Sequence, residues 1–115
     1  MLVDICKAKV ENAVVTEANI HYHGSFTVDE AILEKAGIYP YEKVIVVNFN
    51  NGVRFETYVI PGQKGSGVVC LNGATARLGQ IGDKVGFLVF ASMEENEAKN
   101  FKPKIITLKD GNKAE

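Results

Sequence analysis

Short runs of β-branched and aromatic residues, separated by glycine, proline and asparagine, dominate this sequence. The clearest run, at residues 43–49, reads Lys-Val-Ile-Val-Val-Asn-Phe. Asn50-Asn51-Gly52 follows it, and Asn-Gly between two apolar runs is a strong signal for a β-hairpin. We expect the return strand at residues 53–60, where Pro61-Gly62 ends it. Further strands are expected at residues 2–10, 13–16, 68–71, 84–91 and 104–109.

Helical signals are few and short. Thr27 and Glu30 have the spacing of a capping box, which predicts a helix over residues 31–36 with Gly37 as its C-terminal stop. Residues 94–100 and 74–78 could each form a helical turn, and the polar tail at residues 110–115 is expected to fray. Many short strands with glycine and proline between them predict a mainly β fold, either a compact barrel or a sandwich.

Length and composition limit the function classes. A chain of 115 residues has room for one domain, residues 1–115. Its net charge of −1 gives no electrostatic case for binding nucleic acid or an anionic membrane. No apolar run approaches the length of a membrane span, and the N-terminus lacks the layout of a signal peptide. We therefore expect a cytoplasmic protein, in which Cys6 and Cys70 are reduced packing residues.

The Gly24-Ser25 bond is the feature with the most specific chemistry. A serine that follows glycine can attack the preceding carbonyl with its own hydroxyl and convert that amide into an ester. Elimination from the ester would break the chain and leave a ketone at the former serine. The dipeptide alone is too common to support this reading, but it occurs together with Lys9, with Arg54-Phe55-Glu56-Thr57-Tyr58 and with Asn72-Gly73-Ala74-Thr75-Ala76-Arg77.

These elements, in this order, resemble the pyruvoyl-dependent aspartate decarboxylases, which make β-alanine for pantothenate synthesis. The resemblance covers residues 9–103 and implies a six-stranded double-psi β-barrel. It also implies a proenzyme that cleaves itself between Gly24 and Ser25, giving a small chain of residues 1–24 and a large chain of residues 25–115. Ser25 would become a pyruvoyl group that forms a Schiff base with L-aspartate. Neither a metal nor pyridoxal phosphate is expected as cofactor.

The same resemblance implies roles for individual residues. Tyr58 would be the proton donor, and Arg54 and Lys9 would bind the two carboxylates of the substrate. Thr57 would assist the cleavage and contact substrate. Substrate contacts are also implied for Gly73, Ala74 and Thr75, and supporting hydrogen bonds for Tyr22 and Asn72. A homotetramer with active sites between subunits is implied as well, and a subunit interface would give so small a domain a pocket that excludes water.

Two segments depart from the family pattern. The family often has His-Arg where this chain has Glu11-Asn12, and its Asn-Gly-Ala-Ala-Ala segment has threonine at position 75 here. Neither change removes a group that the chemistry requires. The sequence leaves open whether cleavage is spontaneous or assisted by a maturation factor, and which subunit supplies each pocket residue.

Other functions fit the sequence less well. His21 and His23 have metal-ligand spacing but no obvious third ligand. The residues around Ser25 do not form the Gly-x-Ser-x-Gly motif of a serine hydrolase, and residues 62–67 lack the spacing of a phosphate-binding loop. The remaining alternative is a non-catalytic double-psi barrel that keeps the Gly24-Ser25 bond intact. A pure scaffold would not need Lys9, Arg54, Thr57 and Tyr58 together, so the enzyme is the preferred reading.

Overall fold

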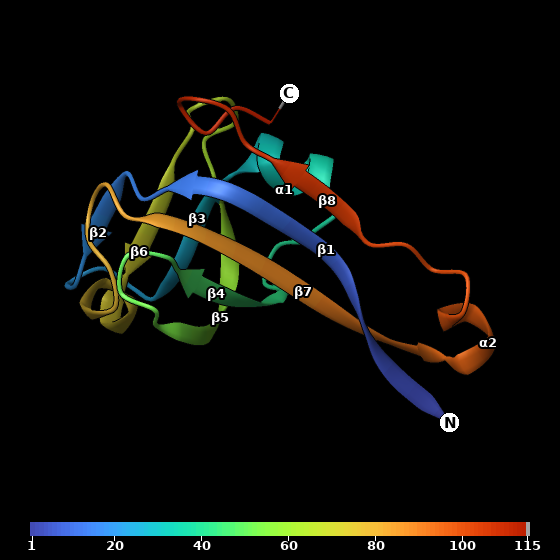
Figure 1. Ribbon diagram of the computed structural model, residues 1–115. Coiled ribbons are helices and arrows are strands. Elements are labelled where there is room, and N and C mark those ends of the chain that lie inside the picture. Colours follow the sequence, from blue (N-terminus) through green and yellow to red (C-terminus); the bar gives the residue numbers. More distant parts are fainter. Residues whose placement is uncertain (115) are drawn as a thin grey trace.

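A mixed β-sheet makes up most of the molecule (Figure 1). The computed structural model describes residues 1–114, and within them there are eight strands, two short α-helices and one 3-10 helix. The strands are β1 (Leu2–Val14), β2 (Glu17–Asn19), β3 (Ser25–Asp29), β4 (Lys43–Asn48), β5 (Arg54–Gly62), β6 (Val69–Asn72), β7 (Lys84–Glu94) and β8 (Lys104–Thr107). The helices are α1 (Glu30–Ala36), α2 (Glu95–Ala98) and the 3-10 helix η1 (Gly73–Arg77). The prediction of a mainly β fold with a few short helices is confirmed.

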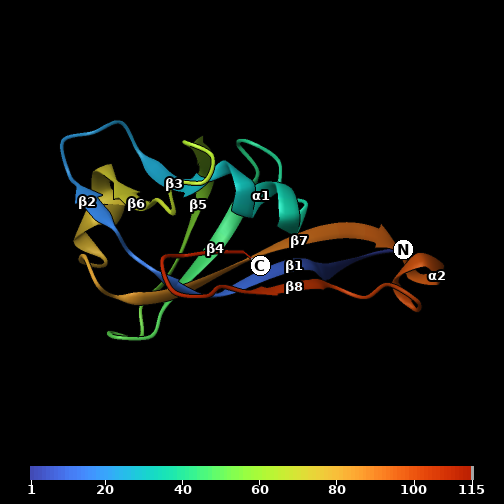
Figure 2. The ribbon, with the colours of Figure 1, turned by 90° about the horizontal axis from the view of Figure 1, so that it is seen from above.

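The strands follow the order β2-β6-β3-β5-β4-β7-β1-β8. Neighbours are antiparallel except for β1 with β8, β2 with β6 and β3 with β5, which are parallel. β1 and β7 extend beyond the body as a long ribbon, with α2 at its far end (Figures 1 and 2). The shorter strands β2, β3 and β6 lie together at the opposite end of the molecule.

The predicted hairpin at residues 50–52 is confirmed. β4 and β5 pair in antiparallel register, with Val47 opposite Arg54. Gly52 has a φ of 77°, a conformation that glycine adopts without strain. The return strand does not stop at Ile60 as expected, because Pro61 and Gly62 continue the parallel pairing of β5 with β3.

The two strands expected near the N-terminus are one strand with irregularities. The register of β1 against β7 shifts between Val10 and Ala13. Asn12 lies in this bulge with a φ of 68°, a region that asparagine tolerates better than most residues. Its side-chain amide donates a hydrogen bond to the Leu108 carbonyl at 2.8 Å. The bulge therefore ties β1 to the end of β8.

One cluster of buried side chains forms the core. Its members come from strands β1 and β3 to β7, from helix α1 and from the connections between them. Phe26 of β3 and Phe87 of β7 are the largest fully buried side chains, and their rings meet edge to face with centroids 5.1 Å apart. This contact joins the end of the sheet that carries β3 to the long ribbon.

Helix α1 begins at Glu30, one residue before the expected range, and its N-cap lies two residues after the Thr27 of the capping-box pattern. The N-cap is Asp29, whose carboxylate accepts a hydrogen bond from the Ala31 amide at 2.8 Å. Thr27 lies inside β3, a strand that the sequence pattern missed. The C-terminal stop is confirmed, since Gly37 has a φ of 72° and donates its amide hydrogen to carbonyls of the last turn.

The expectation of a frayed tail is wrong for residues 110–114, and residue 115 lies outside the described residues. Asn112 is buried, and its side chain binds both the amide and the carbonyl of Val14, each at 2.9 Å. Its amide also donates to the Gly67 carbonyl at 2.8 Å. A polar side chain thus fastens the tail by satisfying buried backbone groups.

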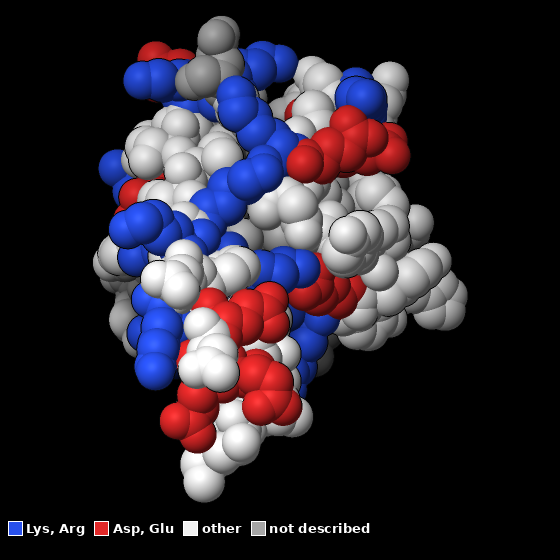
Figure 3. All heavy atoms as spheres, turned by 90° about the vertical axis from the view of Figure 1, so that its right-hand side faces the viewer, with Lys and Arg blue, Asp and Glu red and all other residues white. Residues whose placement is uncertain are grey.

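Charges of both signs are exposed on the face that carries α2. In Figure 3, acidic side chains gather in the lower part of this face, and Lys and Arg side chains run across the face above them. The ammonium group of Met1 lies 3.8 Å from a carboxylate oxygen of Glu94. Within residues 1–114, no helix has the length and apolar character that crossing a membrane requires.

Candidate active site

The Gly24-Ser25 bond lies where three strands meet. Ser25 is the first residue of β3 and pairs with Asn72 of β6 in antiparallel register. On the other side, Phe26 pairs with Val59 of β5 in parallel register. If this register is extended by one residue toward the N-terminus, Ser25 lies beside Tyr58. The sheet therefore brings the candidate cleavage bond next to the candidate proton donor.

The hydroxyl of Ser25 is buried without a hydrogen-bond partner. The residue is 4% exposed, and Oγ is the one buried side-chain oxygen or nitrogen in residues 1–114 that lacks a partner. Leaving a hydroxyl in this state costs about 1–3 kcal/mol, so native proteins rarely retain one without a functional reason. An unbonded serine oxygen keeps both lone pairs available, as a nucleophile requires.

Gly73 packs against the backbone of Gly24. A Cβ atom at position 73 would lie 3.2 Å from the Gly24 Cα and 3.3 Å from its nitrogen, closer than most real contacts. Gly73 also has a φ of 61°, which disfavours other residues. The position therefore needs glycine both for its conformation and for the close approach to Gly24.

Thr75 contacts the carbonyl of the residue that would be converted. Its Oγ1 lies 2.7 Å from the carbonyl oxygen of Asn72 and 3.1 Å from that of Ser25. The hydroxyl has a single proton, so it can donate to one of these two oxygens at a time. The Thr75 hydroxyl is thus in direct contact with the residue that follows the candidate cleavage bond.

A chain of polar side chains runs along the neighbouring wall. Cys70 donates its thiol hydrogen to Asn72 Oδ1 at 3.0 Å, and Asn72 Nδ2 donates to Thr27 Oγ1 at 2.7 Å. Burial raises the pKa of Cys70 to about 11, so this thiol stays protonated and can act as the donor. The side chain of Asn72 is therefore held by Thr27 and Cys70.

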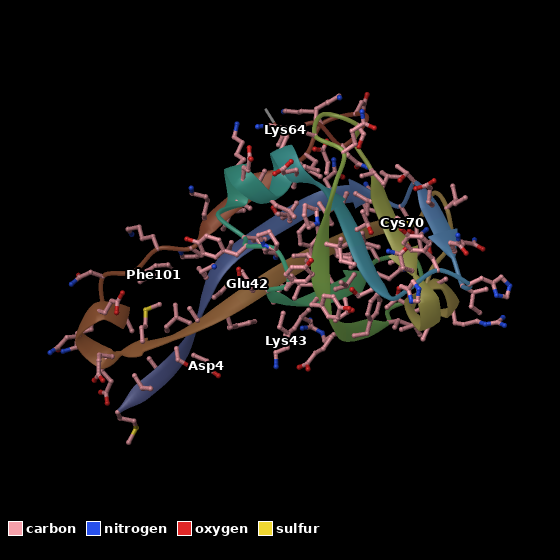
Figure 4. All side chains as sticks on the ribbon, turned by 180° about the vertical axis from the view of Figure 1, so that it is seen from behind. Asp4, Glu42, Lys43, Lys64, Cys70 and Phe101 are labelled. Carbon is pink, nitrogen blue, oxygen red and sulfur yellow. The ribbon has the colours of Figure 1, made fainter. Side chains whose placement is uncertain are left out.

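A cavity of about 450 Å³ lies beside the candidate cleavage site. It is lined by Thr27, Cys70 and Asn72 together with Glu17, Ala18, Asn19, Tyr22 and Ile81. In Figure 4, Cys70 lies at the β6 end of the molecule, far from Asp4 and Phe101 at the ribbon end. Tyr22 lines the cavity as a largely exposed side chain.

Tyr58 lies on the outer face of the sheet and has an aromatic neighbour. Its ring is 6.2 Å from that of Tyr41, centroid to centroid. Tyr41 has a φ of 71°, an uncommon conformation for a residue other than glycine. The Tyr41 amide donates to the Val59 carbonyl at 2.8 Å, which fastens this turn to β5. Thr57 alternates with Tyr58 along β5 and pairs with Val44.

The turn that carries Tyr41 is also held from the other side. Glu42 accepts two hydrogen bonds from the Lys7 ammonium, at 2.8 and 3.0 Å, and one from the Tyr39 amide at 3.0 Å. Figure 4 shows Glu42 between the segment after α1 and the long strands. Because both members of this ion pair are mostly buried, it fixes the turn more firmly than a surface pair would.

Lys9 and Arg54 lie away from Ser25. Lys9 on β1 pairs with Leu88 on β7, and Leu88 pairs with Ile45 on β4. Strands β7 and β4 therefore lie between β1, which carries Lys9, and β5, which pairs with the strand of Ser25. Three strand spacings correspond to about 14 Å. Arg54 is four residues before Tyr58 on β5, or about 13 Å along the strand. The two cations share the outer face of the sheet, yet a single chain does not bring them together with Ser25.

Glu11 lies next to Lys9 on the same strand. Its Oε2 is 3.3 Å from the Lys9 ammonium, and Thr107 donates its hydroxyl hydrogen to Oε1, also at 3.3 Å. Both members of the ion pair are partly exposed. An acidic group thus lies beside a candidate carboxylate-binding lysine.

Two residues of this region escaped the sequence interpretation. Tyr41 carries no local motif, and its only sequence signal is a bulky residue after Pro40 in a turn. Cys70 was interpreted as a packing residue, although it also holds Asn72.

As for a metal, residues 1–114 contain no cluster of three or more His, Cys, Asp or Glu side chains that could bind one, so His21 and His23 have no further ligands there.

The fold and the site define a mainly β protein with a buried, unpaired serine hydroxyl directly after a glycine. The aspartate decarboxylase family model matches residues 1–115, and the chain belongs to this family. The family resemblance drawn from the sequence motifs is therefore confirmed.

Individual relatives agree with this assignment. The aspartate 1-decarboxylase of Leptospira biflexa is 51% identical over 114 residues, which cover 98% of this chain and 97% of that protein. The aspartate 1-decarboxylase of Carboxydothermus hydrogenoformans is 55% identical over 113 residues, covering 98% and 89%. That of Lactiplantibacillus plantarum is 50% identical over 113 residues, covering 98% and 87%.

Proposed function

We propose that this chain is a proenzyme that cleaves itself between Gly24 and Ser25 and then decarboxylates L-aspartate to β-alanine and carbon dioxide. The observation that carries the proposal is the buried, unpartnered Ser25 hydroxyl at the start of β3, in a chain of the aspartate decarboxylase family. The product β-alanine would serve pantothenate synthesis. The proposal places the enzyme in the cytoplasm, where Cys6 and Cys70 would stay reduced.

The family is pyruvoyl-dependent, and the residues around Ser25 fit such a group. Ser25 Oγ has no competing partner, and Gly73 leaves space for the backbone at Gly24. Once formed, the group would supply a carbonyl for the substrate amine and an electron sink for the bond that loses carbon dioxide.

In the cleavage step, the Ser25 hydroxyl would attack the Gly24 carbonyl carbon. The peptide nitrogen leaves as the amine of Ser25, and an ester joins Gly24 to Ser25 Oγ. This exchange of an amide for an ester is uphill, so the site must stabilise the negative charge on the attacked oxygen. Thr57, one residue from Tyr58 on β5, is the residue that we assign to support this step.

In the decarboxylation, the protein supplies charge and a proton. Arg54 offers a planar fork for one carboxylate and Lys9 a compact ammonium for the other. The Tyr58 phenol donates its proton to the substrate carbon after carbon dioxide has left. The backbone of Gly73 and Ala74 and the residue Thr75 contact the substrate. Tyr22 and Asn72 support the site, with Asn72 held by Thr27 and Cys70.

The positions of Lys9 and Arg54 support a shared active site. Because these cations lie away from Ser25 within one chain, we infer that a second copy supplies them, as in a homotetramer with active sites between subunits.

The fold proposal is a closed six-stranded double-psi β-barrel formed by the core strands. Just beyond β1, the Thr16 amide donates to the Val69 carbonyl at 2.8 Å, and the Val69 amide donates to the Thr16 hydroxyl at 2.9 Å. These two bonds link the segment after β1 to β6, near the opposite edge of the sheet, and so favour closure.

Intact mass spectrometry of the purified protein tests the function. We expect two chains divided after Gly24, with the larger chain lighter by one ammonia than simple hydrolysis would leave it. Borohydride in the presence of L-aspartate should then add the reduced substrate to the large chain alone. One uncleaved species after prolonged warm incubation, with cell extract from the source organism added, would overturn the proposal.

A further inference from the structure

We propose that the Thr75 hydroxyl promotes the second half of the self-cleavage, by stabilising negative charge on the Ser25 carbonyl oxygen while the ester eliminates. The inference rests on the proposed function, since it presupposes that the Gly24-Ser25 bond breaks.

The contact that carries the inference is short and local. Thr75 Oγ1 lies 3.1 Å from the Ser25 carbonyl oxygen and 2.7 Å from the Asn72 carbonyl oxygen. The single hydroxyl proton favours the nearer Asn72 carbonyl in the resting chain. A rotation about the Cβ–Oγ1 bond redirects it to Ser25 without any movement of heavy atoms.

The elimination places charge on the oxygen that Thr75 contacts. After the ester has formed, a solvent hydroxide removes the Cα proton of Ser25 and becomes water. The electron pair is shared with the Ser25 carbonyl oxygen as an enolate, then expels Gly24 as a carboxylate when the Cβ–Oγ bond breaks. The resulting dehydroalanine tautomerises to an imine, and water hydrolyses this imine to the ketone and ammonia.

A donor aimed at an oxygen gains strength when that oxygen becomes negative, because hydrogen bonds to charged acceptors are about twice as strong as neutral ones. Burial of the site makes this gain in hydrogen-bond strength larger. Ser25 and Asn72 are both buried, which lowers the local dielectric constant and strengthens a hydrogen bond from Thr75 to a charged oxygen. The Ser25 carbonyl thus has a protein donor within reach at the step where it carries charge.

Position 75 is also fixed in space. It lies in η1, which begins directly after β6, and the antiparallel pairing of Asn72 with Ser25 sets the distance between this turn and the cleavage site. Gly73 allows the turn to approach because it has no Cβ to meet Gly24. Thr75 is therefore a preorganised donor, which avoids the cost of ordering it during the reaction.

The test compares Thr75→Val, Thr75→Ser and Thr75→Ala by the rate of chain cleavage in freshly made precursor. Valine keeps the shape of threonine without the hydroxyl, and serine keeps the hydroxyl. We expect Thr75→Val and Thr75→Ala to cleave about tenfold more slowly than the unmodified chain, and Thr75→Ser to cleave within about twofold of it.

A second readout separates this role from a structural one. When elimination is slowed, the ester accumulates, and brief treatment with hydroxylamine at neutral pH divides the chain after Gly24 at the ester but leaves a Gly24-Ser25 amide intact. We expect Thr75→Val precursor to give more hydroxylamine-dependent cleavage than the unmodified chain, at an unchanged midpoint of thermal unfolding. A lower unfolding midpoint without ester accumulation would mean that Thr75 only secures η1, and would overturn the inference.

The outcomes also distinguish this inference from the proposed function. If the unmodified chain never cleaves, the proposed function fails. If the unmodified chain cleaves and Thr75→Val cleaves equally fast, the function stands and the role of Thr75 is wrong. Thr107→Val is the matched control, because Thr107 loses an equivalent hydroxyl on β8, where its hydrogen bond goes to Glu11.

Discussion

The corner around Ser25 and the outer face that carries Lys9 and Arg54 are built in different ways. At the corner, residues from β3, β6 and η1 touch one another within one chain, through the Ser25–Asn72 pair and the Thr75 contact. On the outer face, the two cations are separated by strands β7 and β4. We infer that self-cleavage is a one-chain reaction, while decarboxylation needs residues from two copies.

The largest expected effect tests this division directly. Ser25→Ala should remain folded, uncleaved and inactive, because no hydroxyl remains to attack Gly24. Arg54→Ala should cleave normally yet lose turnover. If the active site is shared, co-expression of the two variants should restore part of the activity, because some mixed sites combine an intact Ser25 with an intact Arg54.

The measurements are intact mass for cleavage and β-alanine release for activity. Ser92→Ala is the matched control, since this exposed serine donates to Asp4 on the ribbon, away from the cleavage corner. Restoration of no activity at all, despite confirmed mixed oligomers, would show that each chain supplies a complete site.

Asp29 supports the corner rather than the outer face. It is 2% exposed, and it accepts backbone hydrogen bonds from Gly67 at 2.8 Å, Gly65 at 2.9 Å and Ala31 at 2.8 Å. Burial alone would raise the pKa of this carboxyl, but the three amide donors outweigh it and hold the pKa below its ordinary value of 3.8. Asp29→Asn turns an amide nitrogen toward one of these donors, which should lower the free energy of unfolding by about 1–3 kcal/mol.

The pH dependence of this contribution has a definite sign. Because the folded pKa lies below the unfolded value, the stabilisation is present above about pH 4 and is lost as the pH falls through the folded pKa. Urea unfolding from pH 6 to pH 3 should therefore show the unmodified chain losing more stability than Asp29→Asn. Parallel curves for the two proteins would contradict the assignment.

Tyr41 links the two regions, because it packs on the Tyr58 ring near Ser25 while its turn is held by Lys7. Its φ of 71° costs about 1 kcal/mol for a residue with a side chain. Tyr41→Gly should therefore unfold at an equal or higher temperature while kcat falls several-fold, because the Tyr58 phenol is less well oriented. Tyr41→Phe should keep the ring contact and most of the kcat.

Tyr39 provides the comparison for Tyr41, since it is equally exposed in the same turn but packs beneath the Lys7 ammonium. Tyr39→Ala should leave kcat within about twofold of the unmodified value, because a surface cation–π contact contributes little. An equal loss of kcat in both variants would mean that the turn as a whole, and not the Tyr41 ring, positions Tyr58.

The sequence predicted those parts of the fold that depend on local chemistry. The hairpin at residues 50–52 and the stop at Gly37 follow from glycine conformations and were predicted correctly. Strand β3 was missed, because a Thr-x-x-Glu pattern imitates a helix start while the residues themselves are buried between β5 and β6. The tail was also misjudged, since the burial of Asn112 depends on Val14 and Gly67, which are distant in the sequence.

The candidate site shows the same limit. Motifs alone selected Ser25, Tyr58 and Asn72, and these residues lie on three neighbouring strands, with Ser25 paired to Asn72 and the next residue, Phe26, paired to Val59. No sequence pattern could show that Thr75 meets the Ser25 carbonyl or that Tyr41 packs on Tyr58. Each of these contacts is set by tertiary geometry.

The smallest expected effect sharpens the description of the outer face. The Glu11 carboxylate lies 3.3 Å from the Lys9 ammonium, so a substrate carboxylate has to compete with it. A partly exposed ion pair contributes at most about 1 kcal/mol, which corresponds to about a fivefold change in an equilibrium constant. Glu11→Gln should therefore lower KM for L-aspartate by up to about fivefold, leave the cleavage rate unchanged, and lose its advantage at high salt.

Glu34→Gln is the control for this change, because it removes a comparable exposed ion pair, between Glu34 on α1 and Lys64 just after β5, at 2.8 Å. Succinate binding to uncleaved Ser25→Ala, with and without Glu11→Gln, measures the same competition without any turnover. A rise in KM on removing the Glu11 charge would mean that this carboxylate orients Lys9 for the substrate instead of competing for it. The sign of the change therefore decides how the acidic residue at position 11 acts on the outer face.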